Sequence, residues 1–352
     1  PIEGQQRLFV GQVYEGSAAA QAGFVRGDEI TDIGTSVATL RAITSFTSNE
    51  EFNDAFGPSE PGVTGTFRVI PAGGGSTENR AVTTSVFQIN TVPVHTIFTR
   101  SGAGELSKVR YINLRVFIGP ANEALQDAFA EFQAQNVQPV IVDLRYNGGG
   151  LVSVAELLAS LLNKGHAGEV MYRTELNSKH TADEETVLFS DETEAILPVS
   201  IAFLTTDHSA SASEEVINAL APYANVAIVG RSTHGKPVGQ FGFDLGASCD
   251  MRLRLVTFET VDKNGHGGYF NGLPDPAFTD AGCSAPDDMT RAQEDPEEGM
   301  TKEAVYWIDR NVCSTASLGM QKSMMDTART AKWEHSFPSR PSPAQANQLG
   351  FH

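Results

Sequence analysis

Two hydrophobic patterns divide the chain. In the first 92 residues, short apolar stretches are separated by glycine-rich turns, which is typical of a small β-rich domain. Strands are expected at residues 8–13, 30–33, 64–70 and 80–88. One helix is expected from Ser48 to Phe56, because Ser48 and Glu51 have the spacing of a capping box. Residues 1–92 are therefore predicted to form a first domain.

After residue 92 the apolar runs lengthen and alternate with helical periods. Strands are expected at residues 111–117, 139–142, 199–204 and 226–229, and helices at 121–135, 152–163 and 212–221. The run at 139–142 carries no charge, as in a strand buried on both faces. The alternation predicts a mainly parallel sheet and an α/β core over residues 93–285. Residues 286–352 are predicted to form an acidic C-terminal extension with one helix near 302–311.

Composition narrows the classes of function. Lys plus Arg number 25 and Asp plus Glu number 43, so the net charge is 25 − 43 = −18. Nucleic-acid binding needs a basic face, and an anionic membrane would repel this chain, so neither is expected as a partner. At about 150 residues per domain, 352 residues fit two domains with an appendage. No apolar run reaches the roughly 18 residues of a membrane-spanning helix.

The cysteine spacing does not indicate a metal site. The three cysteines are Cys249, Cys283 and Cys313, and no two of them form a CxxC pair. We therefore expect no zinc site. We also expect no other metal and no cofactor. One disulfide with one free thiol, and three free thiols, both fit the count, so the pairing and the redox compartment stay open.

The segment Ser209-Ala210-Ser211-Ala212-Ser213-Glu214 is the first candidate for chemistry. It follows a predicted buried strand and opens a predicted helix, where unpaired N–H groups face a serine oxygen. A nucleophile and an oxyanion site can share such a turn. However, Ser211 and Glu214 also have the spacing of a capping box, which requires no catalysis and is the commoner explanation of the local pattern.

A lysine loop follows the next predicted strand. Residues 230–236 match the phosphate-binding pattern GxxxxGK, but Pro237 replaces the Ser or Thr that would reach magnesium, and a strand follows. We therefore expect no nucleotide. Burial disfavours the ammonium form, so Lys236 could instead serve as the base for a serine. Gln240 would share a strand face with Lys236 and could orient it. The structural alternatives are an exposed loop lysine and an ordinary strand glutamine.

A glycine turn and two histidines complete the candidates. Residues 147–150, Asn-Gly-Gly-Gly, follow a predicted buried strand. Glycines there either let backbone N–H groups approach a ligand or simply make a tight turn. His208 and His234 flank the two motifs without partners at a fixed spacing, and GxSxG and HExxH are absent. A serine–histidine hydrolase is therefore disfavoured.

Taken in order, three segments resemble the C-terminal processing (tail-specific) serine proteases. Residues 142–150 resemble the family's D-L-R-x-N-x-G-G turn. Residues 209–214 resemble its S-A-S-A-S-E segment, and residues 229–240 resemble its V-G-x-x-T-x-G-K-x-x-x-Q segment. The resemblance implies a ClpP/crotonase-like α/β protease core over residues 93–285.

The same resemblance implies the roles of individual residues. Ser211 corresponds to the nucleophile, Lys236 to its base and Gln240 to the residue that orients the lysine. The backbone N–H groups of Gly150 and Ala212 correspond to the oxyanion hole. The implied activity is that of a serine endopeptidase acting on protein or peptide substrates with accessible C-terminal tails. A non-catalytic binding module on the same fold is the alternative, and the presence of all three side chains argues against it.

The first 92 residues resemble a PDZ domain, which this family carries before its protease core. The matching pieces are Gly16–Ala19, Ala22-Gly23 and Gly27–Ile30. A PDZ domain adds a peptide tail to a sheet edge and holds its carboxylate with backbone N–H groups. The carboxylate loop is expected at or before Pro1, so the domain would be truncated at its start.

The resemblance also implies a location. We expect a protein of the bacterial cell envelope or periplasm, secreted or lipid-anchored, whose targeting segment lies outside these residues. The physiological substrate, the oligomeric state and any gating of the site by the PDZ-like domain stay open.

Overall fold

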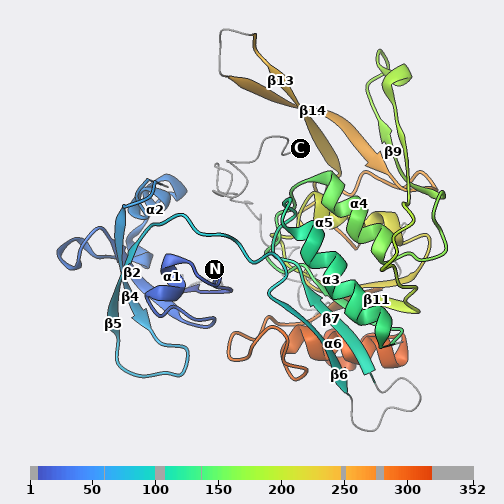
Figure 1. The fold of residues 1–352 in the computed structure, drawn as a ribbon. Helices are drawn as coiled ribbons and strands as arrows, with labels where there is room; N and C mark the ends of the chain where they lie inside the picture. Colours follow the sequence, from blue (N-terminus) through green and yellow to red (C-terminus); the bar gives the residue numbers. More distant parts are fainter. Residues whose placement is uncertain are drawn as a thin grey trace. The chain divides into compact units, whose positions relative to one another are not determined.

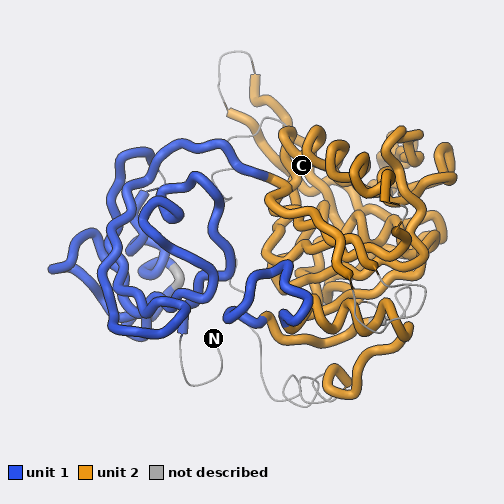
Figure 2. Tube along the Cα trace, turned by 60° about the horizontal axis from the view of Figure 1, so that its bottom comes forward, with its two compact units in different colours: residues 1–90, 288–298, 331–346 blue, residues 91–287, 299–330, 347–352 orange. Residues whose placement is uncertain are grey.

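The computed structural model describes residues 7–58, 60–99, 108–135, 137–246, 251–274 and 281–318. Within these ranges the chain forms two compact units, which Figure 2 colours separately. The first unit comprises residues 7–90 and 288–298, and the second comprises residues 91–287 and 299–318. Cys249 and the end of the predicted extension, residues 319–352, lie outside the described residues.

The first unit is built on one antiparallel sheet (Figure 1). Its strands are β1 (Leu8–Phe9), β2 (Glu29–Gly34), β3 (Arg41–Ala42), β4 (Thr64–Ile70) and β5 (Glu78–Thr83). The helices are α1 (Ala18–Gln21) and α2 (Asn49–Ala55), with 3₁₀ turns at Val37–Thr39 and Ile43–Ser45. The predicted cap of α2 is confirmed, because the Ser48 side chain accepts the Glu51 N–H at 3.2 Å. β1 and β5 are shorter than expected because their pairing with β2 and β4 ends early.

A six-stranded sheet lies at the centre of the second unit. In sheet order its strands are β15 (Ala281–Ser284), β12 (Asn225–Gly230), β11 (Ser200–Thr205), β8 (Val140–Asp143), β7 (Lys108–Asn113) and β6 (Val94–Thr99). Only the edge strand β6 runs antiparallel to its neighbour, so the predicted mainly parallel sheet is confirmed. β8 is fully buried, as its uncharged run indicated. The strand expected at 111–117 ends earlier, at Asn113.

Helices pack against both faces of this sheet. The helices α3 (Ala121–Ala134), α4 (Val152–Leu161) and α5 (Ala212–Leu220) share the larger apolar core with one set of alternating strand residues. α6 (Gly299–Arg310) packs against the other set through Met300, Ala304 and Trp307. The helix expected near 302–311 is thus confirmed, and it closes the second face of the central sheet.

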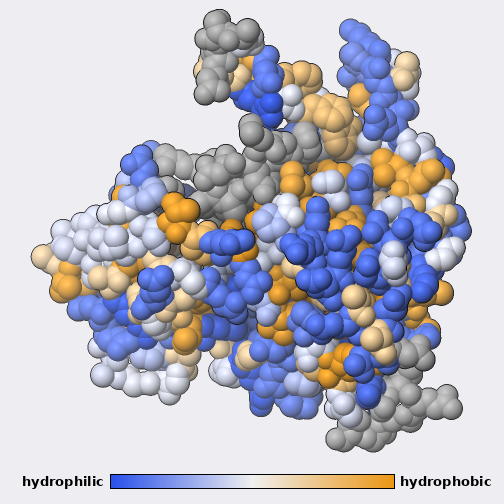
Figure 3. All heavy atoms as spheres, viewed as in Figure 1, coloured by the Kyte–Doolittle hydropathy of each residue, from blue (hydrophilic) through white to orange (hydrophobic). Residues whose placement is uncertain are grey.

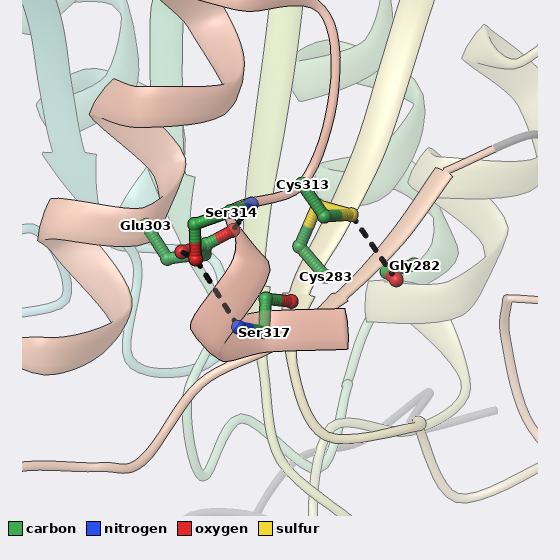
Figure 4. Close-up of a disulfide and its surroundings, with 6 residues drawn as sticks. All are labelled: Gly282, Cys283, Glu303, Cys313, Ser314 and Ser317. Atoms are coloured by element: carbon green, nitrogen blue, oxygen red, sulfur yellow. Dashed lines mark hydrogen bonds between the residues drawn. A yellow bond between two sulfur atoms is a disulfide. The ribbon is translucent and has the colours of Figure 1, made fainter. Parts of the chain in front are cut away.

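A disulfide joins Cys283 of β15 to Cys313, just after α6 (Figure 4). Ser314 caps this region by donating its hydroxyl and its N–H to the carboxylate of Glu303, at 2.6 and 2.8 Å. The Glu303 carboxylate and the two sulfur atoms lie within 4.8 Å of one another. Because the sulfur atoms are bonded to each other, they are not free thiolates for a metal.

A second sheet of this unit has four antiparallel strands. In sheet order they are β10 (Thr186–Leu188), β9 (Val170–Glu175), β14 (Arg252–Val261) and β13 (Val238–Asp244), and a 3₁₀ turn lies at Thr181–Asp183. β13 and β14 continue beyond β9 as a two-stranded arm (Figure 1). Among the described residues, no helix has the length and apolar character needed to cross a membrane.

Candidate active site

The nucleophile candidate Ser211 lies in a strained turn between β11 and α5. It is the N-cap residue of α5, with φ +57° and ψ −118°. An ordinary N-cap residue is extended, and a non-glycine residue with positive φ is uncommon. Such strain gathers at functional sites, and a sharp turn between a strand and a helix exposes the nucleophilic oxygen of many hydrolases. A helix cap does not require a positive φ, so capping alone does not explain the backbone conformation of Ser211.

The two neighbouring serines have structural roles. Both are fully buried: the Ser209 hydroxyl donates to the Leu144 carbonyl at 2.7 Å, and the Ser213 hydroxyl donates to the Asn147 carbonyl at 2.9 Å. Ser211, in contrast, is only partly buried. Within this segment it is the serine that a substrate can reach.

The glycine turn after β8 packs directly against the nucleophile turn. The Ala210 N–H donates to the Asn147 carbonyl at 3.1 Å, and the Asn147 side chain accepts the Gly149 N–H at 2.9 Å. A Cβ atom on Gly149 would lie 2.7 Å from the Ala210 oxygen and 2.9 Å from Ser211 Cβ. Only glycine allows this approach, so the contact with the nucleophile turn requires a glycine at position 149.

Two N–H groups at this contact are available to a ligand. Within the described residues, neither the Gly150 N–H nor the Ala212 N–H donates a hydrogen bond. Ala212 is the first residue of α5, where N–H groups have no partner inside the helix and where negative charge is stabilised. These are the two donors that the family resemblance assigned to an oxyanion hole.

Glu214 connects the nucleophile turn to the lysine loop. One of its oxygens accepts the backbone N–H groups of Ser211 and Lys236, at 2.8 and 2.9 Å. The other accepts the Gly235 N–H and the Thr233 hydroxyl, both at 2.6 Å. Burial raises the pKa of Glu214, and its four donors act in the opposite direction. The predicted capping box is therefore present, and its carboxylate also positions a second loop, which the sequence pattern did not reveal.

The surroundings of Lys236 disfavour the charged form of its amine. Burial lowers the pKa of its amine, and the negative charge of Glu214 opposes this effect. Within the described residues its amine makes no hydrogen bond or ion pair, so the contact with the Ser211 hydroxyl is not made in this structure. Contacts of this kind often tighten only when substrate binds.

Gln240 lies in β13, opposite Val256 of β14. β13 begins at Val238, so Lys236 precedes the strand, and the alternation argument that placed both side chains on one face does not extend to it. The strand expected after Pro237 is confirmed. It stands where a phosphate-binding loop would need a helix.

The loop at residues 269–274 closes the other side of the lysine loop. The Thr233 N–H donates to the Leu273 carbonyl at 2.9 Å, and the Leu273 N–H donates to the Thr233 hydroxyl at 2.7 Å. The carbonyl of Phe270 lies against Gly235, where a Cβ atom would come within 2.5 Å of it. Because Phe270 is 59% exposed, an accessible aromatic residue borders the lysine loop.

A buried ion pair supports the glycine turn. The Asp143 and Arg145 side chains are inaccessible to solvent and lie 2.6 Å apart, and the Tyr111 hydroxyl donates to Asp143 at 2.6 Å. A buried pair with this many partners holds one geometry, and loss of either partner would leave an uncompensated charge. The ion pair gives a structural reason why the motif contains Asp143 and Arg145. The sequence signal was the change from apolar to charged residues at the end of a strand.

Comparison with known proteins identifies the domain that contains this geometry. Residues 108–275 match the model of peptidase family S41. This part of the chain is an S41 peptidase domain. The resemblance drawn from the three motifs is thereby confirmed.

Curated relatives of the S41 domain carry corresponding names. Carboxyl-terminal-processing peptidase 2 of Arabidopsis thaliana is 26% identical over 266 residues, which cover 73% of this chain and 48% of the relative. Carboxy-terminal processing protease CtpB of Bacillus subtilis is 25% identical over 174 residues, which cover 49% of this chain and 35% of the relative. The chain thus spans about half or less of the length of these relatives.

Solved structures share the fold. A Bacteroides fragilis protein assigned to the S41 proteases superposes with a TM-score of 0.66 at 19% identity, covering 88% of this chain and 79% of that one. The photosystem II D1 C-terminal processing protease gives a TM-score of 0.50 at 22% identity, covering 79% and 68%. At these identities the likeness establishes the mixed α/β fold of the S41 proteases.

Proposed function

We propose that this chain is a serine endopeptidase of the C-terminal processing type, with Ser211 as its nucleophile. The observation that carries the proposal is the positive φ of Ser211 at the start of α5, against a glycine turn that leaves two N–H groups available. The names of the curated relatives support the same activity. A non-catalytic module has no use for a strained, accessible serine beside a lysine whose pKa burial lowers.

In the proposed mechanism, Ser211 Oγ attacks the carbonyl carbon of a substrate peptide bond. The neutral Lys236 amine takes the hydroxyl proton and returns it to the departing amine, while Gln240 orients the lysine. The N–H groups of Gly150 and Ala212 hold the oxyanion. Water then hydrolyses the acyl-enzyme, and no cofactor takes part.

We further propose that residues 1–92 act as a PDZ-like module, that residues 93–285 are the protease core, and that residues 286–352 are an extension. The small antiparallel sheet and two helices of the first unit support the PDZ-like assignment. Its sheet edge would take the accessible C-terminal tail of a protein substrate. The disulfide between Cys283 and Cys313 supports an oxidising compartment such as the periplasm.

Cleavage of unstructured peptides with apolar C-termini tests the proposal. Mass spectrometry of the products should show internal peptide-bond hydrolysis by the wild-type chain. The Ser211→Ala variant should lose this activity by about 10³-fold or more, and Ser209→Ala, which weakens a buried contact, distinguishes loss of the nucleophile from loss of packing. An active Ser211→Ala variant would overturn the assignment, and peptide binding without cleavage by the wild type would favour the non-catalytic alternative.

A further inference from the structure

Asp287 is a carboxylate of the second unit that is largely withdrawn from solvent. Hydrophilic side chains cover much of the face of this unit drawn in Figure 3, whereas only 14% of the Asp287 side chain is exposed. Asp287 lies three residues after β15, in the segment predicted from the sequence as an acidic extension. It also lies beyond residue 275, where the match to the S41 model ends. Neither the motifs nor the family match therefore gives it a role.

The carboxylate of Asp287 binds two consecutive residues at the start of the glycine turn. One oxygen accepts Nη1–H of the Arg145 guanidinium at 3.2 Å, and the other accepts the hydroxyl of Tyr146. Arg145 also donates Nε–H and Nη2–H to Asp143, at 3.0 and 2.6 Å. Because the guanidinium is planar and faces a carboxylate on two sides, its orientation is fixed.

The backbone of Tyr146 is strained. Its φ is +64°, a left-handed conformation that is uncommon for a bulky residue. Such a conformation persists only where the surroundings over-determine it. The Tyr146 N–H donates to the Thr206 hydroxyl at 3.2 Å, and Asp287 holds the far end of the side chain. Tyr146 is thus anchored at both ends to segments that are distant in the sequence.

Tyr146 leads directly into the turn that carries a proposed oxyanion donor. The next residue, Asn147, accepts the Ala210 N–H at its carbonyl and the Gly149 N–H at its side chain, at 3.1 and 2.9 Å. A change of φ rotates the chain that follows it. Release of Tyr146 would therefore displace Asn147 and, through it, the N–H group of Gly150.

The segment that carries Asp287 is itself fixed to the central sheet. β15 pairs with β12 along its whole length, and the Ala285 N–H continues this pairing by donating to the Gly230 carbonyl at 3.3 Å. The disulfide from Cys283 to Cys313 holds the same strand. Asp287 follows Ala285 by two residues, so its carboxylate is placed by rigid structure and can hold another residue in a strained conformation.

We propose that Asp287 is a positioning residue for the oxyanion hole. It holds Arg145 and Tyr146, and it thereby keeps the Gly150 N–H directed at the oxygen of the peptide bond that Ser211 attacks. The inference rests on the proposed function, since it assigns a role within that reaction. Oxyanion donors act on the transition state, so loss of Asp287 should lower kcat and leave KM nearly unchanged.

Steady-state kinetics on an unstructured peptide test this role. Asp287→Ala removes both hydrogen bonds, whereas Tyr146→Phe removes a single oxygen atom. Each should lower kcat by about 10–100-fold, and in the combined variant the two losses should not add, because both act on the same turn. Asp287→Asn should keep most of kcat, since its amide can accept from Arg145 and donate to the Tyr146 oxygen.

Asp32→Ala is the matched control. The Asp32 side chain is 15% exposed, and it accepts an N–H of Arg68 at 3.1 Å and the Thr31 hydroxyl at 2.7 Å. The control loses nearly the same contacts in the first unit, so it should show a similar decrease in Tm and keep its kcat. If folded Asp287→Ala keeps the kcat of this control, the proposal is overturned. An Asp287→Asn variant that falls as far as Asp287→Ala also overturns it.

Hydrogen–deuterium exchange makes a second test that does not depend on cleavage. The Gly149 N–H is bonded to the Asn147 side chain, so exchange in residues 146–150 reports whether the turn keeps its shape. Exchange there should be about tenfold faster in Asp287→Ala and Tyr146→Phe than in the wild type and in Asp32→Ala. An absence of cleavage by the wild type contradicts the proposed function and leaves this measurement intact. Unchanged exchange in both variants contradicts the role of Asp287 alone.

Discussion

Replacement of Gly149 by alanine tests whether the turn at Ser211 is the catalytic centre. Gly149 has φ +95°, and a Cβ atom there would lie 2.7 Å from the Ala210 oxygen and 2.9 Å from Ser211 Cβ. Contacts between such atoms are normally about 3.5–4.0 Å. The alanine therefore cannot be accommodated unless the two turns separate by about 1 Å.

Two effects of Gly149→Ala can be estimated. The left-handed backbone costs an L-residue about 1–2 kcal/mol, which at about 2–4 °C per kcal/mol lowers Tm by roughly 2–8 °C. A shift of about 1 Å between the nucleophile and its surroundings costs about 10²-fold in rate. We expect kcat/KM for an unstructured peptide to fall by about 100-fold in a protein that is still folded at 25 °C.

Gly165→Ala is the matched control. Gly165 has φ +94°, nearly the same as Gly149, but no atom lies within 4 Å of its Cβ position. It should therefore show a similar decrease in Tm and keep its peptidase activity. Thermal melts and initial rates of both variants make the comparison. If folded Gly149→Ala retained the activity of Gly165→Ala, catalysis would not depend on the turn at Ser211, and the reasoning would be refuted.

Three further predictions concern buried groups. Glu214→Gln removes the charge that raises the pKa of Lys236, so the ascending limb of kcat/KM against pH should move to lower pH. The substitution also disrupts about two hydrogen bonds, which contribute roughly 1.5–3 kcal/mol each to stability. If the variant is folded and its ascending limb does not move, the charge of Glu214 does not control the pKa of Lys236. Burial raises the pKa of Glu215 to about 8, whereas the unfolded carboxyl titrates near 4.5. The folded state therefore binds more protons than the unfolded state between these values, so the stability of the wild type should fall as pH rises from about 4.5 to 8. Tm of Glu215→Gln, measured between pH 5 and 8.5, should not show this decrease, and an equal decrease in the variant would exclude Glu215 as its source. Cys283→Ser should lower unfolding free energy by about 3–4 kcal/mol, because the disulfide to Cys313 closes a loop of about 30 residues; a reductant should lower Tm of the wild type and not of the variant, and an effect on both would point elsewhere.

The central elements could be predicted from the sequence because their signals are local. The buried strands β8, β11 and β12 are continuous apolar runs, and the structure places each within one residue of the expected bounds. Boundaries were less accurate where a strand ends with its pairing partner, as for β1, β5 and β7. No property of an isolated segment records how far the neighbouring strand extends.

The site shows the same division. The strand-to-helix turn at Ser211 and the strand after Lys236 follow from local patterns. The alternation argument for Gln240 was less successful, since the strand begins only at Val238. The role of Glu214 was hidden because its partner loop lies 19–22 residues further along the chain. The pattern Ser-x-x-Glu is the same whether the carboxylate only caps the helix or also binds a second loop.

The sequence by itself determined the fold class, the family and the order of the chemical groups along the chain. These depend on hydrophobic periodicity, on turn residues and on short motifs, which are properties of neighbouring residues. Only the tertiary structure decided the pairing of Cys283 with Cys313, the positive φ of Ser211 and the four donors of Glu214. Each of these is set by contacts between distant segments, and the free energy of such contacts depends on which segments the fold brings together.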